Sequence, residues 1–525
     1  MAKTRVASIN DIREGVIHGV TIGDTELILV RTDGRIRALG GRCPHHDAPL
    51  ADGLLDGNHV LCPWHQSVFD ATDGALVEPP ALDGLATYDV ELDGDDVIVD
   101  LPNEDQGNPQ PKTVTRDRST DNHTIVIVGG GAAGLSAAQE IRRADYRGRL
   151  VMVSEDPYPP YDRPNCSKDF LAGEAPAEWL PLKPLSFYQD AGIERIEHRA
   201  DTIDVTSRRI AFPGGSSIDA DGLLLATGGE PKTLDVPGSN LEGITTLRSR
   251  SDCERIGDRV DTGARVVVVG ASFIGMEVAA SLTQRGANHV TVVAPDDVPF
   301  ENTLGPRVGA LFEETHRGRG VDFRLGTSVA GFEGNGSVRA VALDNGHTLD
   351  TDLVVIGVGV KPATDGIEGI DLEPDGSVRV DELLSVRPGV FAAGDIATFP
   401  DWRTGEPTRI EHWRTALQQG IVAGRNLAGE TRPFRAVPFF WTMQFDAGIG
   451  YVGHAVEWDD EIVHGDLDDR DFMIYYVRGG RVLAGAAMGR DRQLSALHEL
   501  MALEREPFAE DLRDRDLDLV DLLRG

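Results

Sequence analysis

At 525 residues the chain is too long for one hydrophobic core, and its length alone predicts three or four domains. The formal net charge of −35 argues against nucleic acid or anionic membrane as a partner, because phosphate binding needs clustered Lys and Arg. The N-terminus lacks the apolar segment of a signal peptide, and no run approaches about eighteen apolar residues. We therefore expect a cytoplasmic protein without a membrane span.

The pattern over residues 1–102 predicts a small all-β domain. Two apolar runs, 25–31 and 35–39, flank Asp33-Gly34, which is a strong hairpin signal. Residues 85–101 repeat the arrangement around Asp93-Gly94. These turns predict short antiparallel strands, with the intervening loops at one tip of the domain.

Two of these loops carry metal-ligand residues. Cys43 and His45 form a Cys-x-His pair, and Cys62 and His65 form a Cys-x-x-His pair, with sixteen residues between His45 and Cys62. Two thiolates and two imidazoles suit a [2Fe–2S] cluster in which Cys residues hold one iron and His residues the other. A Cys2His2 zinc site uses the same ligands and is the alternative, although zinc sites more often contain Cys-x-x-Cys pairs.

The residues around the second pair favour the cluster. Cys62-Pro-Trp-His65, followed by Phe69-Asp70 and Asp73-Gly74, resembles a Rieske domain. Gln66 stands where Rieske domains usually have glycine, so we expect the turn beside His65 to differ. His46 is a spare histidine that we expect to face solvent.

A polar, Pro-containing stretch follows at 103–122 and is predicted to be a linker. After it, the buried-strand run 124–128 leads into Gly129, Gly131 and Gly134 and then a helix from Leu135 to Arg143. A second strand, 149–153, ends before Glu155, where an acid is expected to bind a ribose. Strand, glycines, helix, strand and acid together predict a dinucleotide-binding unit.

The unit repeats 141 residues later, with Gly270, Ser272 and Gly275 after the strand 265–269. Ser272 replaces the middle glycine, which a small side chain tolerates. The next strand, 289–293, leads to Ala294 where a ribose acid would stand, and no Lys or Arg replaces it to receive a 2′-phosphate. We therefore expect NADH rather than NADPH as the substrate.

Further strand-and-glycine patterns follow each dinucleotide-binding unit. Thr227-Gly228 and Gly357 each come after an apolar run that predicts a buried strand. Gly394-Asp395 places an acid where it can accept a hydrogen bond from a ribityl hydroxyl. Beyond Pro433 the chain is strand-rich again, with a helix over 494–504 and a charged tail.

We predict a multidomain fold with a small all-β Rieske domain, two Rossmann-like α/β domains and an α+β C-terminal domain. The predicted boundaries are 1–102 for the Rieske domain, 103–122 for the linker, 123–239 with 361–432 for a discontinuous FAD-binding domain, 240–360 for the NAD-binding domain and 433–525 for a reductase or dimerisation-type domain.

From Thr124 to about Leu503 the chain resembles NADH-using ferredoxin reductases of oxygenase systems and apoptosis-inducing-factor-like flavoproteins, a subgroup of which carries the same Rieske fusion. The marks of this resemblance are the stretches 160–168, 226–228, 394–395, 411–413 and 439–441. It implies FAD as cofactor, with Arg163 and Lys168 reaching the flavin. A cation there stabilises the anionic reduced ring.

The resemblance also implies that Glu277 lies near the nicotinamide, and that Glu411, Trp413 and Trp441 line the flavin. The residues expected to take part in catalysis are Lys168, Glu277, Glu411 and Trp441. The residues expected to bind FAD or NADH are Gly129, Gly131, Ala132, Ala133, Gly134, Glu155, Arg163, Lys168, Thr227, Gly228, Gly270, Ser272, Ile274, Gly275, Glu277, Gly357, Gly394, Asp395, Glu411, His412, Trp413 and Trp441.

Disulfide reductases on the same scaffold need two Cys residues at short spacing beside the flavin. Cys166 has no second Cys near it in sequence, and Cys253 is the other residue left over, so both are expected to be unpaired thiols. This spacing predicts that no dithiol takes part.

We expect an electron-transfer flavoprotein in which NADH reduces FAD and single electrons pass to the [2Fe–2S] cluster. The expected partner is a ferredoxin or oxygenase-like electron acceptor, and a homodimer is also compatible with the sequence. The alternative is a redox-gated signalling or assembly flavoprotein with slow NADH turnover. A self-contained oxygenase would need a 2-His-1-carboxylate iron site, for which the sequence offers no recognisable cluster.

Overall fold

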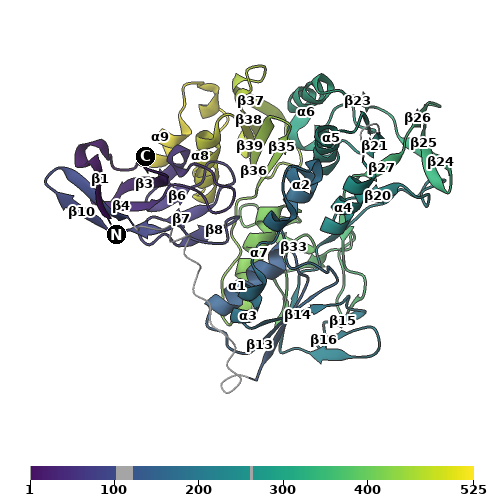
Figure 1. Cartoon of the computed structure of the whole chain (residues 1–525), viewed down its shortest axis with the longest axis horizontal. Helices are drawn as coiled ribbons and strands as arrows, with labels where there is room; N and C mark the ends of the chain where they lie inside the picture. Colours follow the sequence, from purple (N-terminus) through teal and green to yellow (C-terminus); the bar gives the residue numbers. More distant parts are fainter. Residues whose placement is uncertain (1, 102–121, 261–263) are drawn as a thin grey trace.

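The computed structural model describes residues 2–101, 122–260 and 264–525. Four regions lie side by side: an N-terminal β region (2–101), a first α/β region (122–239 and 361–432), a second α/β region (240–260 and 264–360) and a C-terminal region (433–525). Figure 1 shows the N-terminal β region, in purple, beside the yellow end of the C-terminal region. The predicted linker 103–122 lies outside the described residues except for Asn122.

The N-terminal β region is built from three small sheets with the two predicted hairpins in place. β3 pairs with β4 across Asp33-Gly34, where both residues have positive φ, and β10 pairs with β11 across residues 94–95. The positive φ values match the twist that two-residue hairpin turns require. The elements are β1 (Ala2–Ser8), η1 (Ile9–Asp11), β2 (Ile17–Ile22), β3 (Thr25–Thr32), β4 (Arg35–Gly40), η2 (Leu50–Asp52), β5 (Leu54–Asp56), β6 (His59–Leu61), β7 (Val68–Asp70), β8 (Leu76–Glu78), β9 (Thr87–Tyr88), β10 (Val90–Asp93) and β11 (Asp96–Leu101).

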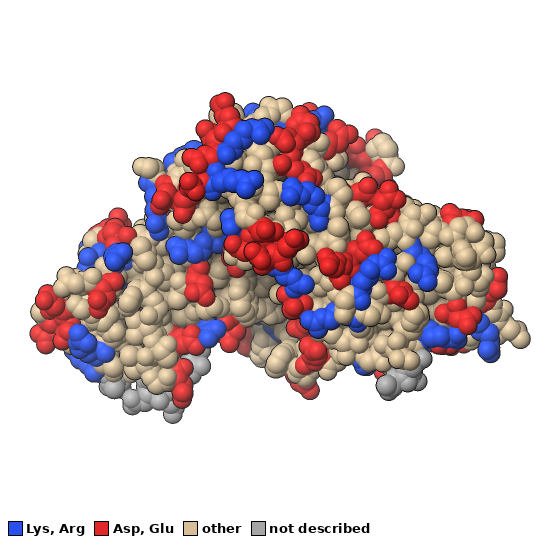
Figure 2. Space-filling view, turned by 90° about the horizontal axis from the view of Figure 1, so that it is seen from above, with Lys and Arg blue, Asp and Glu red and all other residues tan. Residues whose placement is uncertain are grey.

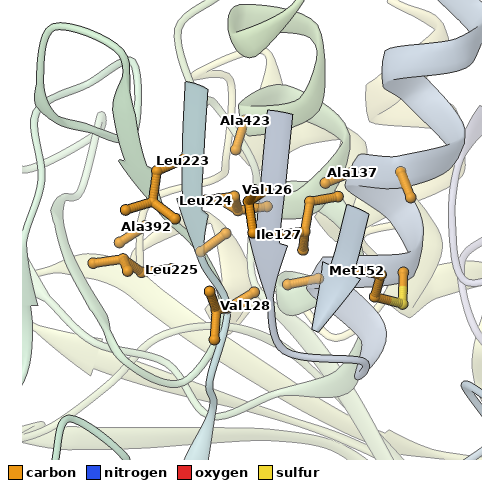
Figure 3. Packing of buried hydrophobic residues seen from close by; sticks show 14 of the residues in the cluster. Val126, Ile127, Val128, Ala137, Met152, Leu223, Leu224, Leu225, Ala392 and Ala423 are labelled. Carbon is orange, nitrogen blue, oxygen red and sulfur yellow. The ribbon is translucent and has the colours of Figure 1, made fainter. Parts of the chain in front are cut away.

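The first α/β region surrounds a six-stranded sheet in the order β14-β13-β12-β18-β32-β31, parallel except for β31. Its core joins the sheet to α1 and α7, as the packing of Val126, Leu224 and Ala137 illustrates (Figure 3). α1 begins at Ala132, three residues before the predicted start, because Gly131 already serves as its N-cap. The sheet and its two main helices are β12 (Thr124–Val128), α1 (Ala132–Arg143), β13 (Arg149–Ser154), β14 (Ile193–Glu197), β18 (Gly222–Leu225), β31 (Ser385–Arg387), β32 (Val390–Ala392) and α7 (Trp413–Leu427).

Shorter elements of this region carry the loops around the site. They are η3 (Pro164–Ser167), α2 (Asp169–Ala172), η4 (Ala177–Trp179), α3 (Leu185–Asp190), β15 (Thr202–Asp204), β16 (Arg209–Ala211), β17 (Ser217–Asp219), β29 (Ile367–Glu368), β30 (Val378–Arg379), β33 (Ala397–Pro400) and β34 (Pro407–Thr408). β19 (Gly229–Pro231) and β28 (Val360–Pro362) pair antiparallel where the chain leaves this region and returns to it.

The second α/β region repeats the design with a five-stranded parallel sheet in the order β20-β27-β21-β22-β23. Its valine-rich central strands are buried on both faces, which is typical of parallel sheets covered by helices. The elements are β20 (Ile244–Thr246), α4 (Arg250–Arg259), β21 (Arg265–Val269), α5 (Phe273–Arg285), β22 (His289–Val293), α6 (Glu301–Gly318), β23 (Val321–Arg324), β24 (Val329–Asn335), β25 (Ser337–Leu343), β26 (Thr348–Asp350) and β27 (Leu353–Ile356).

The C-terminal region is a five-stranded antiparallel sheet in the order β35-β36-β39-β38-β37, covered on one side by α8 and α9. The charged tail expected after residue 504 ends in a short helix, α9. Leu519, Val520 and Leu523 are buried, and α9 packs on α8. The elements are β35 (Phe439–Gln444), β36 (Ala447–Gly453), β37 (Asp460–Asp466), β38 (Asp471–Arg478), β39 (Arg481–Met488), α8 (Asp491–Ala502), η5 (Asp511–Arg513) and α9 (Leu519–Arg524).

Two surface properties bear on partners. On the face shown in Figure 2, basic and acidic side chains are interspersed rather than separated into large patches. Within the described ranges, no helix is both long and apolar enough to cross a lipid bilayer.

Candidate functional site

A cavity of about 1010 Å³ lies where the two α/β regions meet the C-terminal region. Ligand sites typically measure about 300–1,000 Å³, so this cavity has the size of a large cofactor site. The residues expected to bind FAD or NADH that line it are Gly129, Gly131, Ala132, Ala133, Glu155, Arg163, Lys168, Thr227, Gly228, Ser272, Ile274, Glu277, Gly394, Asp395, Glu411, His412, Trp413 and Trp441. The structure therefore brings most of the expected residues to one place.

The first glycine loop has room for a pyrophosphate. A Cβ atom on Gly131 would meet no atom within 4 Å, so the backbone beside the start of α1 is open to the cavity. A Cβ on Gly129 would lie 2.0 Å from the Ala226 carbonyl oxygen, which permits only glycine at this turn. Helix N-termini bind anions through their free N–H groups. This geometry fits the phosphates of a dinucleotide such as FAD.

Four of the expected residues, Gly134, Gly270, Gly275 and Gly357, are not among the residues that line the cavity. A Cβ on Gly134 would lie 2.0 Å from the Gly129 carbonyl oxygen. A Cβ on Gly275 would lie 2.1 Å from the Gly270 carbonyl oxygen. These glycines let each helix approach its strand, so they shape the loops from behind.

In the second loop, Ser272 is the N-cap of α5 and faces the cavity. Its hydroxyl donates to the Gly357 carbonyl oxygen at 2.8 Å. Ile274 beside it is 44% exposed and also lines the cavity. The loop therefore keeps an open face despite the replacement of its middle glycine.

Glu277 lies at the centre of a buried polar cluster that joins three regions. Its Oε1 atom lies 2.8 Å from Lys168 Nζ and accepts a hydrogen bond from Thr442 Oγ1 at 2.7 Å. Its Oε2 atom accepts one from Ser167 Oγ at 2.5 Å. Glu277 is 3% exposed, so the Lys168 cation supplies the charge that makes this burial tolerable. The cluster fixes the Lys168 ammonium at the cavity wall.

A second charged cluster lies around Asp395. Its Oδ2 atom accepts a hydrogen bond from Arg248 Nη2 at 2.7 Å, and the Arg248 carbonyl oxygen accepts one from Arg163 Nη1 at 2.8 Å. Arg409 pairs with Glu411. Burial raises the pKa of Glu411, and the Arg409 charge offsets part of this rise. Sequence reasoning missed Arg248 and Arg409. Neither lies in a motif, and Arg248 meets Asp395 across 147 positions of sequence.

The four expected metal ligands lie in two pairs. His45 Nδ1 and His65 Nδ1 are 3.0 Å apart, and Cys43 and Cys62 are both buried. A hydrogen bond between the two thiols raises the pKa of Cys43 and lowers that of Cys62. Burial lowers the pKa of both histidines well below the usual value, so both rings are neutral, as metal ligation requires. A sulfur pair beside an imidazole pair fits a [2Fe–2S] cluster with two ligands on each iron.

Trp441 joins this ligand set to the cavity. Its ring lines the cavity, and its centroid lies 4.2 Å from that of His65 and 5.9 Å from that of His45. The spare His46 does more than face solvent: its side chain is 42% exposed, and Nε2 lies 3.4 Å from Asp162 Oδ2 in the first α/β region. Both imidazoles therefore lie against the Trp441 ring, which itself lines the cavity.

The remaining thiols correct one sequence inference. Cys166 has no cysteine neighbour in sequence, but in the structure it lies beside Cys253 on α4. A hydrogen bond between the two thiols is the largest cause of the raised pKa of Cys253. Both residues are 2% exposed and belong to one apolar cluster. The short-spacing argument could not detect a pair separated by 87 positions of sequence.

The end of β22 also differs from its expected role. Ala294, the position examined for a ribose acid, is 1% exposed and does not line the cavity. Its amide donates to the Arg324 carbonyl oxygen at 3.1 Å. An acid at this position would be buried away from the cavity.

Comparison with known sequences decides the family. The sequence model of the pyridine nucleotide-disulphide oxidoreductase family matches residues 123–420. The chain belongs to this family. The Rieske [2Fe–2S] domain model matches residues 2–89, and the reductase C-terminal model matches residues 439–523.

Similar proteins cover nearly the whole chain. Apoptosis-inducing factor 3 of Homo sapiens is 35% identical over 98% of this chain and 85% of its own length. Putidaredoxin reductase of Pseudomonas putida is 33% identical over 70% of this chain and 89% of its own length. The solved covalent complex of putidaredoxin reductase with putidaredoxin superimposes with a TM-score of 0.72 at 31% identity, covering 77% of this chain and 98% of the other.

These findings confirm the resemblance inferred from the motifs, and with it the fold class. The pyridine nucleotide-disulphide oxidoreductase part is a ferredoxin-reductase-like NAD(P)H oxidoreductase that uses FAD, and the Rieske domain carries a [2Fe–2S] cluster. FAD exchanges two electrons with a nicotinamide and can release them singly. The Rieske match also supports a [2Fe–2S] cluster in place of the zinc alternative.

Proposed function

We propose that NADH delivers a hydride to FAD in the cavity, and that the two electrons then leave singly through the Rieske cluster to a protein acceptor. Each hydride leaves one NAD⁺, and the two electrons reduce two acceptor molecules in turn. A ferredoxin-type or oxygenase-like protein suits this role, because a solved relative is a putidaredoxin reductase–putidaredoxin complex. The class of reaction is therefore NADH-dependent reduction of a one-electron carrier.

The observation that carries this proposal is the position of Trp441. One indole ring lines the cofactor cavity and also contacts His65 at a centroid distance of 4.2 Å. The cluster ligands and the cavity are thus separated by a single aromatic side chain. A protein with independent sites would have no need for this contact.

The roles of the other side chains follow from their contacts. In this proposal Lys168, held by Glu277, would supply a positive charge to the reduced flavin, and Glu277 on α5 would contact the nicotinamide. Asp395 is placed to accept a hydrogen bond from the flavin side chain. Glu411, His412 and Trp413 form the wall at the start of α7.

Other features of the proposal rest on the sequence pattern and on burial. NADH is the favoured nucleotide because the loop after β22 carries Asp296 and Asp297, which would repel a 2′-phosphate. In this proposal no dithiol takes part in the electron route, because Cys166 and Cys253 are buried in an apolar cluster and neither is among the residues that line the cavity. The free thiols suit a reducing cytoplasm.

Replacing Trp441 tests the route. In Trp441→Leu we expect NADH reduction of ferricyanide, which can accept electrons from the flavin directly, to stay within about threefold of wild type. Reduction of the cluster by NADH should slow by at least tenfold, about 1.4 kcal/mol of barrier. The matched control is Trp458→Leu, because Trp458 lies in the same region but packs on Tyr476. Cluster reduction at the wild-type rate in Trp441→Leu would refute the route.

A further inference from the structure

Arg414 is a fully buried cation at the junction of the Rieske domain, α7 and α8. It is the second residue of α7, and its side chain is 0% exposed. Nε donates to the Pro79 carbonyl oxygen at 2.9 Å, and Nη2 donates to the Gln66 carbonyl oxygen at 3.0 Å. The guanidinium therefore binds two backbone carbonyls of the Rieske domain, one of them directly after the ligand His65.

Gln66 makes the matching contact with the other neighbour. Its φ of 61° is the left-handed conformation that favours glycine, and its side chain is 1% exposed. Nε2 donates to Ser495 Oγ on α8 at 2.6 Å. A non-glycine residue at positive φ is strained, and the hydrogen bond to Ser495 offsets this local strain. Glycine would fit the turn but could not make this contact.

The surroundings of Arg414 explain how its charge is accommodated. Burial lowers its pKa, and the charges of Glu78 and Glu499 act in the opposite direction. Glu78 Oε2 lies 3.9 Å from Nη2 and is held by Gln418 Nε2 at 2.7 Å. On the other side, His498 Nε2 lies 3.4 Å from Nη1, and His498 Nδ1 contacts Glu499 at 2.9 Å. Every group that faces the guanidinium belongs to one of the three packed units.

We propose that Arg414 and Gln66 form an interdomain lock that holds the His65 loop against α7 and α8. A buried charge bound to fixed carbonyls tolerates displacement poorly, because undocking would leave it without partners. The lock thus keeps the imidazole ligands at Trp441 without a docking step in each turnover. Arg414 is a positioning residue, and only the consequence for electron transfer rests on the proposed function.

The buried charge has a second consequence. A cation near the cluster stabilises its reduced, more negative form and therefore raises its reduction potential. Lysine at this position would keep the charge but could not reproduce the planar, multidentate contact with two carbonyls. Charge and geometry are therefore separable by substitution.

The lock is tested on the full-length holoprotein by hydrogen–deuterium exchange. In Arg414→Met we expect at least tenfold faster exchange of protected amides in 60–82, such as Cys62, whose amide bonds the Ser67 carbonyl oxygen at 2.8 Å. The control is Arg425→Met, on the same helix but paired with Glu140 inside the flavin domain. Exchange in Arg414→Met within twofold of wild type would overturn the lock.

Gln66→Gly keeps the test decisive if Arg414→Met does not fold, because glycine suits the positive φ at this position. We expect faster exchange at the start of α8, around Ser495, in this variant. Unchanged exchange at that helix would remove Gln66 from the lock.

Two further readouts separate positioning from general support. Redox titration by EPR should give a lower cluster potential in Arg414→Met and a potential near wild type in Arg414→Lys. Equal potentials in all three proteins would contradict the assigned buried charge. When the proteins are mixed with NADH under anaerobic conditions, cluster reduction relative to flavin reduction should be slower in Arg414→Met and Arg414→Lys than in wild type. If NADH does not reduce the cluster of the wild-type protein, the proposed function is wrong. The exchange experiment would still test the interdomain lock independently.

Discussion

His412 lies in the wall of the cavity, and most of its side chain is shielded from solvent. Desolvation is the main cause that lowers its pKa to about 3, and the charge of His454 adds to the effect. Nδ1 has no hydrogen-bond partner in the structure. The ring is therefore neutral at physiological pH, and its place beside Glu411 and Trp413 does not depend on protonation near neutrality.

This burial predicts a defined loss of stability in acid. The unfolded chain binds a proton at His412 below about pH 6.5, whereas the folded protein does so only near pH 3. Stability therefore falls with pH between these values, by about 2 kcal/mol from pH 7.5 to 5 for this residue. His412→Asn should lose that much less over this interval, measured by apparent Tm of the holoprotein. The exposed His347→Asn is the control, and an equal acid loss in His412→Asn and wild type would contradict the assignment.

Sequence patterns predicted residues whose role follows from local backbone, and missed those whose role depends on distant partners. Gly129 and Gly131 follow a strand and precede a helix, so their function is visible in the motif. Arg248 and Arg414 lie in no motif. Arg248 binds Asp395, which is 147 positions away in sequence, and Arg414 binds the Gln66 carbonyl oxygen, which is 348 positions away. The sequence shows Gln66 where glycine is usual, but it does not show the hydrogen bond to Ser495 that the glutamine side chain makes.

At the scale of elements, η3 and α4 bring the two remaining thiols together. Cys166 on η3 and Cys253 on α4 are buried within one apolar cluster, beside the loop that carries Arg163 and Lys168. Both thiols are 2% exposed, and neither is among the residues that line the cofactor cavity. The contact therefore reads as packing between two elements and not as a redox pair.

Removing both thiols tests this interpretation. In the double variant Cys166→Ser/Cys253→Ser we expect NADH oxidation with ferricyanide to stay within a few-fold of wild type. A loss of roughly a hundredfold, about 2.7 kcal/mol of barrier, would show that the thiols take part in turnover. FAD content measured by absorbance separates such a loss from loss of cofactor.

Elements with a strong local pattern were predicted well. The hairpins at Asp33-Gly34 and Asp93-Gly94, the two strand–glycine–helix units and the helix near 494–504 are present within a few residues of their predicted bounds. α9 was missed because six charged residues over 510–516 precede it, while its buried face consists of only two leucines and a valine. Its stability comes from packing on α8, which no local pattern reports.

At the scale of the molecule, the Rieske domain is docked on the reductase. Leu54, Leu61 and Val68 share an apolar cluster with α8 and the C-terminal sheet. Lys183 of the first α/β region pairs with Asp83, and Arg524 Nη2 donates to the Gly15 carbonyl oxygen at 2.8 Å. The interface includes polar and apolar contacts on both neighbours. The Rieske domain and the reductase part therefore form one packed unit, with the ligand loops beside Trp441.

The most direct test of this account is anaerobic stopped flow of the full-length holoprotein with NADH, following flavin and cluster absorbance together. Because the ligand loops are docked at Trp441, we predict that cluster bleaching follows flavin reduction at a rate independent of protein concentration. If the flavin is reduced within the mixing time while the cluster stays oxidised for minutes, the electron route is wrong and a redox-gated signalling role takes its place.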